Sequence, residues 1–201
     1  MNNYTFEQYE DAAETRAWFV QFLEEHNGPD WEENLPFPLS DFVSRSTLPS
    51  LNGEPILISW YRIKCDSVLV GYADVKAYPL FNGRKVISDV WILPQFRNRG
   101  HYHRSFSALV NHTTAVAVCV SRETYRLYGE WYASFGFDHA SALFVPEPLF
   151  LTTKEAHRDM VRFLIKYVPG ICPTSERSRA VFEDVKRELR GAEPQGAVPS
   201  D

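Results

Sequence analysis

The stretch Asp89-Val-Trp-Ile-Leu-Pro-Gln-Phe-Arg-Asn-Arg-Gly-His-Tyr-His-Arg-Ser-Phe106 decides the fold of this chain. An apolar strand ends at Pro94, a short loop with two arginines and a glycine follows, and a helix is predicted over about 101–113. The start of a helix presents unpaired backbone N–H groups and a partial positive charge, so it binds phosphate well. Arg97 and Arg99 would add charge-assisted hydrogen bonds.

Three strand-like runs lead into this segment, at residues 56–64, 68–78 and 86–93. They are rich in β-branched and aromatic residues, and Asn82-Gly83 between the last two is typical of a tight turn. Gly71 inside the second run indicates a bulge. We therefore predict an antiparallel meander.

The first fifty residues predict a short strand over 4–9 and a helix over 11–26, which Asn27-Gly28-Pro29 ends. Residues 29–53 are rich in Pro, Asn and Ser, with room for a short helix near 39–46. The apolar face of the first helix is formed by Ala13, Trp18, Phe19, Phe22 and Leu23.

Strand and helix alternate after the central segment. Ala115 to Val120 is fully apolar, which is typical of a buried parallel strand. Ser121 is a suitable cap for a helix that Gly136 ends, and residues 140–146 indicate another strand. We predict an α/β fold of the mixed α+β kind, with a central mixed sheet flanked by helices. The predicted helix carries an aromatic stripe of Tyr125, Tyr128, Trp131, Tyr132 and Phe135.

The last fifty residues contain two helical patterns, over 153–167 and 174–190, with Thr174 or Ser175 as the cap of the second. A Pro/Gly-rich stretch follows. We predict one domain over 1–150, a C-terminal helical extension over 151–190 and a disordered tail over 191–201.

Composition and charge exclude several classes of protein. The chain has 201 residues and a net charge of −5, which argues against a protein that covers a nucleic-acid duplex. Cys65, Cys119 and Cys172 are odd in number and widely spaced, so neither a disulfide framework nor a zinc site is predicted. His101 and His103 are two apart and share no helix face, so no metal is expected. With no signal peptide and no membrane-length apolar run, we expect a cytoplasmic protein that does not contact a membrane.

Two motifs in this order match a known family. Arg97-Asn-Arg-Gly-His-Tyr102 fits R/Q-x-x-G-x-G/A, except that Tyr102 replaces the small sixth residue, and Trp131-Tyr-Ala-Ser-Phe-Gly-Phe137 fits F-Y-x-x-x-G-F. Together, and with the apolar strand 115–120 between them, they resemble the GCN5-related N-acetyltransferases (GNAT). The resemblance covers roughly residues 55–146.

The resemblance implies direct transfer of an acetyl group from acetyl-coenzyme A to the primary amine of an unspecified acceptor. It places Tyr132 as the acid that protonates the departing thiolate, and Asp89 as our first choice of base, with Glu130 and His101 in reserve. Ser88 stands where polyamine-modifying relatives keep their base, which disfavours a polyamine. The residues implied in cofactor binding are Trp91, Ile92, Arg97, Asn98, Arg99, Gly100, His101 and Tyr102.

Alternatives stay open at this point. Tyr132 can belong to a packing stripe, and Asp89 to a structural salt bridge. Tyr102 can close the cofactor site, which would leave a binding protein without catalysis, and an amine on modified nucleic acid is a third option. The C-terminal helices can cover the acceptor cleft or form a homodimer contact. By resemblance, Trp31, Phe37 and Phe42 line the acceptor pocket.

Overall fold

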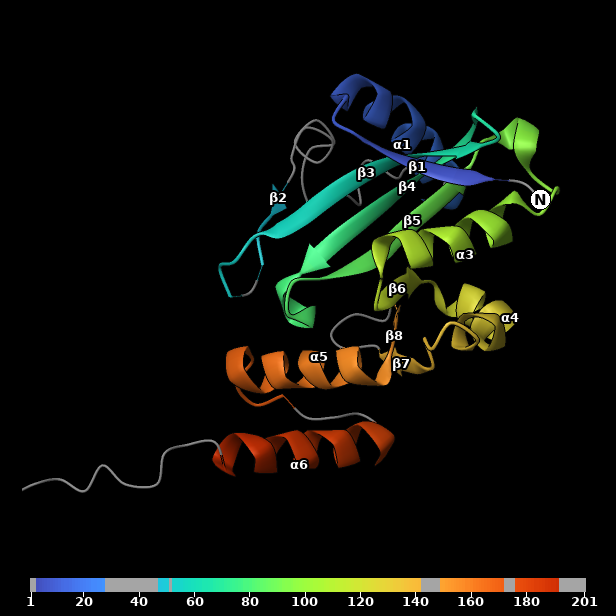
Figure 1. Ribbon diagram of the computed structural model, residues 1–201. Coiled ribbons are helices and arrows are strands. Elements are labelled where there is room, and N and C mark those ends of the chain that lie inside the picture. The colour runs from blue at the N-terminus through green and yellow to red at the C-terminus, as the bar shows by residue number, and fades with distance from the viewer. Residues whose placement is uncertain (1–2, 28–46, 51, 142–148, 172–175, 192–201) are drawn as a thin grey trace, which may run out of the picture.

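The computed structural model describes residues 3–27, 47–50, 52–141, 149–171 and 176–191. Within these residues, eight strands form one mixed sheet in the order β1-β3-β4-β5-β6-β8-β7, with β2 paired to β3 (Figure 1). The strands are β1 (Tyr4–Tyr9), β2 (Thr47–Leu48), β3 (Ile56–Cys65), β4 (Val68–Tyr78), β5 (Arg84–Ile92), β6 (Ala117–Val120), β7 (His139–Ser141) and β8 (Leu149–Thr152).

Helices cover the sheet on both faces, which confirms the predicted fold class. The helices are α1 (Ala12–Asn27), α3 (His101–Thr113), α4 (Arg122–Ala133), α5 (Lys154–Tyr167) and α6 (Glu176–Gly191), with 3-10 turns η2 (Pro79–Phe81) and η3 (Pro94–Phe96). None of these described helices has the length and apolar character needed to cross a membrane.

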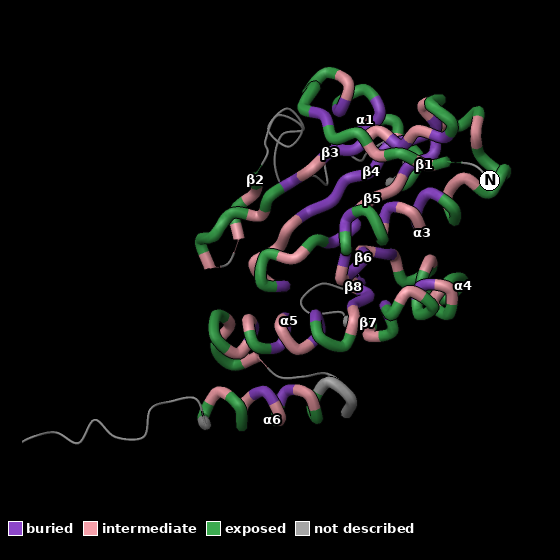
Figure 2. The backbone as a smooth tube through the Cα atoms, in the orientation of Figure 1, coloured by how far each residue is buried: buried purple, intermediate pink, exposed green. Residues whose placement is uncertain are grey.

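The two faces of the sheet follow from the alternation of side chains along each strand. Trp60 and Tyr72 pack with Trp18 of α1 on one face, whereas Tyr61 and Ala73 belong to a second cluster on the other face. That second cluster contains Phe106 of α3 and Tyr132 of α4. Most of β4 is buried, and it runs through the middle of the molecule (Figure 2). It is therefore the rigid centre against which β5 is held.

Register shifts interrupt the meander at two places. Between β3 and β4 the extra residue is Val70, beside Gly71, so the predicted bulge is confirmed. Between β4 and β5, Asp74 pairs with Asp89 and Val75 with Ile87, which leaves Ser88 as the extra residue. The Asn82-Gly83 turn is also confirmed, since both residues have positive φ.

Three local expectations need correction or limits, and one strand was not predicted. Ala13 is exposed and does not join the apolar face of α1. The apolar run 115–120 contains β6, which is parallel to β5 as expected. The antiparallel pairing of β6 with β8 was not predicted from the sequence. The predicted boundary at residue 150 falls inside β8, and α5 adds Ala156 and Met160 to a core shared with β5 and β6. β2 was also unforeseen, because two residues carry no periodicity.

Several predictions fall outside the described residues. These are the short helix near 39–46, the far part of the strand 142–146, the tail after residue 191, and the roles of Trp31, Phe37, Phe42, Thr174 and Ser175.

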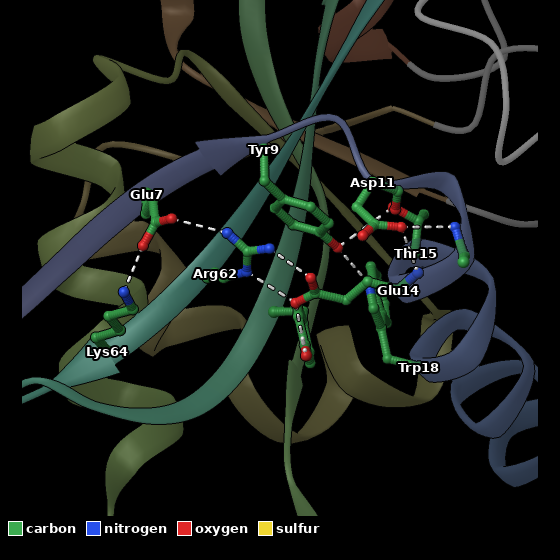
Figure 3. Close-up of polar contacts among 10 residues, drawn as sticks. Glu7, Tyr9, Asp11, Glu14, Thr15, Trp18, Arg62 and Lys64 are labelled. Carbon is green, nitrogen blue, oxygen red and sulfur yellow. Dashed lines mark hydrogen bonds and ion pairs between the residues drawn. The ribbon is translucent and has the colours of Figure 1, made fainter.

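A polar network fastens α1 to the sheet (Figure 3). Arg62 on β3 donates from Nε to Glu14 Oε1 of α1 at 2.8 Å and from one terminal nitrogen to Glu7 of β1 at 2.7 Å. The Tyr72 hydroxyl donates to Glu14 at 3.0 Å, and Trp18 Nε1 donates to the Tyr9 hydroxyl at 2.6 Å. Because these groups come from four elements, the network fixes where α1 crosses the sheet.

Replacing Glu14 with Gln should destabilise the fold by about 1 kcal/mol at neutral pH, since a charged, hydrogen-bonded partner of Arg62 is lost. The hydrogen bond from Arg62 lowers the pKa of Glu14. Its contribution is therefore complete above the unfolded-state pKa and disappears as the pH falls through the lower folded-state pKa. Urea unfolding at pH 7 and pH 3 measures this, with Glu24→Gln, at an exposed site on the same helix, as the control. An equal loss at both pH values would contradict the prediction.

Candidate active site

The sheet opens between β5 and β6. These parallel strands pair at Val86–Ala117 and Ile87–Val118, and no further pairs occur between them in the described chain. A cavity of about 790 Å³ lies at this opening, with walls from α1, α3, α4 and strands β4, β5, β6 and β8. Asp89 and Tyr132, the two predicted catalytic residues, both line it.

Backbone groups of β5 point into the opening. The Leu93 N–H donates to Val70 O at 2.9 Å, so it faces β4. Since backbone groups alternate in direction along a strand, the N–H and C=O of Val90 and Ile92 face the opposite way, toward the parted side. The Ile92 carbonyl accepts from Arg97 Nε at 2.9 Å on that side. Val90 thus presents a backbone donor at the cavity. The resemblance implies free backbone amides beside this strand, but the sequence did not single out Val90.

Asp89 lies in a buried group of charges. Its backbone N–H donates to Asp74 Oδ1 at 3.1 Å, and Asp74 Oδ2 is 2.8 Å from Lys76 Nζ. Burial, and then the Asp74 carboxylate, raise the pKa of Asp89 to about 7 against the opposing effect of Lys76. Asp89 therefore changes between acid and base near neutral pH. Asp74 and Lys76 were not predicted, because only the strand register brings them beside Asp89.

The bulge residue Ser88 also lines the first cavity, together with Tyr78 and Cys119. The buried Ser88 hydroxyl lies near Tyr78 and Cys119, without a hydrogen bond of good geometry in the described part of the chain. Burial raises the pKa of the Cys119 thiol to about 12, so this cysteine is not a nucleophile at neutral pH.

Tyr132 projects from the end of α4, whose start is fixed by Ser121. The Ser121 hydroxyl accepts from the Thr124 N–H at 3.0 Å, as the sequence predicted. Tyr132 is 1% exposed and packs edge-on against Phe106. Its hydroxyl is 2.9 Å from that of Tyr102, and burial raises its pKa. The aromatic stripe is only partly a packing face, since Tyr125 and Tyr128 are 40% and 45% exposed.

The predicted phosphate-binding loop borders a second cavity of about 600 Å³. Asn98 and Gly100 adopt positive φ, which turns the chain into α3, and among the described residues no side chain caps that helix. Gly100 suits this conformation because it has no Cβ. The two cavities share wall residues Val90 and Tyr102, so they adjoin.

The arginines of the loop differ in their surroundings. Arg97 donates to Glu25 Oε2 of α1 at 2.7 Å and lies over the Trp91 ring, although it is exposed, as Arg99 is. The guanidinium of Arg104 bonds the carbonyls of Arg99 and Gly100. A phosphate contact for Arg97 and Arg99 stays a prediction, and for Arg97 it would compete with Glu25.

The remaining residues predicted for the site differ in where the structure places them. Trp91 and Ile92 are buried, with the Trp91 ring in the aromatic cluster beneath α1. The backbone of Ile92 faces the opening, whereas that of Trp91 faces β4, where Trp91 pairs with Tyr72. His101 lines the second cavity, with Nδ1 2.8 Å from the Tyr4 hydroxyl. Burial, then Arg104 and Arg99, lower its pKa. Glu130 is exposed and outside both cavity walls, and His101 lines only the second cavity, whereas Asp89 lines the first together with Tyr132.

Comparisons with known proteins give similarity of fold at low identity. No family model matches the chain, and no curated protein matches it either. Solved structures similar to it include a GNAT-family acetyltransferase from Bacillus cereus, with 13% identity and a TM-score of 0.42 over 76% of this chain and 98% of that one. An acyl-CoA N-acyltransferase from Pseudomonas aeruginosa has 17% identity and a TM-score of 0.43, over 75% and 97% of the two chains. The PaiA N-acetyltransferase from Thermoplasma acidophilum, solved with coenzyme A, has 12% identity and a TM-score of 0.43, over 75% and 99%.

At these values the comparisons report likeness of fold, so the site must be interpreted from the residues of this chain. In the described ranges, no group of three or more His, Cys, Asp or Glu side chains is placed to hold a metal ion.

Asp89→Asn should make the protein more stable at pH 8, by about 1–3 kcal/mol. A carboxyl group whose pKa is raised in the folded state destabilises the fold once it ionises. The gain should therefore be absent below pH 4, grow between pH 4 and about 7, and stay constant above that. Urea unfolding across this range tests it, with Glu130→Gln as an exposed control. A stability gain that does not depend on pH would count against a partly buried Asp89 that ionises near neutral pH.

Proposed function

We propose that this protein is an N-acetyltransferase that moves an acetyl group from acetyl-coenzyme A to a primary amine. The observation that carries the proposal is the parting of β5 and β6 beside a cavity lined by both Asp89 and Tyr132. A base, an acid and outward-facing backbone donors thereby surround one space. The adjoining loop cavity gives that space a second compartment.

The residues around the second cavity suit the cofactor. The uncapped start of α3 after Gly100 provides N–H groups for a pyrophosphate, with Asn98 and His101 at the rim. The Val90 and Ile92 backbone groups would bind the amide-containing arm, as a strand partner does. When bound, acetyl-coenzyme A supplies a thioester, whose carbonyl carbon bonds to the amine nitrogen while its carbon–sulfur bond breaks.

Asp89 is the proposed base. An amine attacks only when neutral, and a carboxylate with a pKa of about 7 is ionised often enough to accept its proton at neutral pH. Lys76 neutralises Asp74, so Asp89 is the carboxylate that faces the cavity without a paired cation of its own. The Val90 N–H is the proposed donor to the oxygen on which negative charge develops.

Tyr132 is the proposed acid. Its hydroxyl proton goes to the leaving sulfur, while Asp89 gains the proton lost by the amine, so the two transfers balance. Burial keeps Tyr132 protonated at neutral pH, which an acid requires.

Binding of acetyl-coenzyme A tests the first part of the proposal. Isothermal titration should show saturable binding to the wild type and at least a tenfold loss in Gly100→Trp, because a bulky residue at this positive φ obstructs the loop. Gly53→Trp is the matched control, since Gly53 also has positive φ but faces open space. A well-folded wild type that does not bind would favour the alternative of a binding protein without catalysis.

Release of free thiol in the presence of an amine panel tests the chemistry. Asp89→Asn and Tyr132→Phe should each lower kcat about 100-fold. The wild-type rate should rise with pH through about 7, as Asp89 becomes ionised. Glu130→Gln and Tyr125→Phe are the matched controls on exposed parts of α4. Full activity in Asp89→Asn with loss in Glu130→Gln would move the base to Glu130.

A further inference from the structure

Tyr102 occupies a place where the resembling family keeps a small residue, and here it meets the proposed acid. We propose that Tyr102 is a positioning residue that holds the Tyr132 hydroxyl at the reaction cavity and donates a hydrogen bond to its oxygen. The two hydroxyl oxygens are 2.9 Å apart, on the first turn of α3 and the last turn of α4. The catalytic role of this pair of tyrosines rests on the proposed function, whereas the contact between their hydroxyls does not.

The direction of the Tyr102 side chain is fixed by its surroundings. Its ring stacks on the fully buried Phe106, with centroids 6.1 Å apart and planes inclined at 22°. Trp131 flanks it from α4, at 6.1 Å between centroids. The ring therefore turns away from the loop backbone and toward α4. Tyr102 still lines the loop cavity, but its hydroxyl is directed to Tyr132 of α4.

Donation from Tyr102 to Tyr132 is the direction that suits an acid. When Tyr132 loses its proton, negative charge appears on a buried oxygen, which is costly without a donor. A hydroxyl held at 2.9 Å stabilises that oxygen and costs no reorganisation at the moment of transfer. Burial raises the pKa of both tyrosines, and the shared bond raises that of Tyr102 further while lowering that of Tyr132. Tyr132 is thus the member that releases a proton first.

Other titratable groups face the pair from each neighbouring element. Asp89 lies on β5, His103 on α3, Tyr128 on α4 and His26 on α1, and all four line the same cavity. Asp89 and Tyr128 raise the pKa of Tyr102 through their charge, and Tyr128 does the same for Tyr132. The charges on Asp89 and Tyr128 oppose ionisation of the tyrosine pair. Among the groups named here, Tyr102 is the one that favours the ionised form of Tyr132.

The first experiment uses the resting protein with [¹³Cζ]-tyrosine labelling and NMR. Tyr102→Phe keeps the ring and its stacking but removes the hydroxyl. We expect the Tyr132 signal to move at pH 7 and its ionisation to begin at higher pH than in the wild type. Tyr125→Phe removes the hydroxyl of an exposed tyrosine two helical turns away on α4 and should leave the Tyr132 signal unchanged. An unchanged Tyr132 signal in Tyr102→Phe would overturn the proposal, whether or not the protein is an acetyltransferase.

The second experiment is a double-mutant cycle on thiol release. Tyr102→Phe should lower kcat about 10-fold, as expected for one lost hydrogen bond to a developing charge, and leave the affinity for acetyl-coenzyme A unchanged. In a Tyr132→Phe background the same change should have no further effect, because Tyr102 acts through Tyr132. Equal losses in both backgrounds would assign Tyr102 a role separate from Tyr132 and overturn the positioning. If the wild type binds no acetyl-coenzyme A, the proposed function fails, and the NMR result alone decides on the pair.

Discussion

The early end of pairing between β5 and β6 is the constraint on which the rest of the site depends. Two residue pairs join these strands, and beyond them the backbone of Val90 and Ile92 faces the parted side instead of a neighbouring strand, where the Ile92 carbonyl accepts from Arg97. Backbone groups without strand partners inside a sheet are costly, so such an opening persists only where something else holds its walls apart. The backbone groups on this side that no strand pairs are the ones that an extended ligand would use.

The β5 wall of the cavity is held by packing against α1 on one face of the sheet. Trp91 is packed among the aromatic rings of α1, and its indole N–H donates to Glu25 at 3.1 Å. Glu25 also accepts a hydrogen bond from Arg97, in the loop between β5 and α3. The opposite wall is held by Phe106, which lies in one cluster with Tyr132 and the β6 residue Val118. Packing on both faces thus holds the walls of the opening in place.

Most of the fold could be predicted from local sequence signals. Contacts between side chains of different elements could not be predicted in this way. The meander, the helix after Gly100 and the Ser121 cap depend on residues within a few positions of one another, so the sequence contains them. The pairing of Asp74 with Asp89 depends on a one-residue bulge, and a slip of one residue would send Asp89 to the other face. The direction of Tyr102 likewise depends on Phe106 and Trp131, which no short motif encodes together.

Under the proposed function, the charges around Asp89 would let one site attract a cation and then accept its proton. Asp74 and Lys76 cancel, so the buried group is neutral when Asp89 is protonated and carries one negative charge when it is ionised. An ammonium ion would be drawn to the ionised form, and a proton transfer from ammonium to Asp89 leaves a neutral amine beside a neutral acid. Because burial and Asp74 raise the pKa of Asp89 to about 7, that transfer costs less than it would to an ordinary carboxylate. The buried ion pair, which is an expensive feature for stability alone, is thereby accounted for by the pKa that it helps to set.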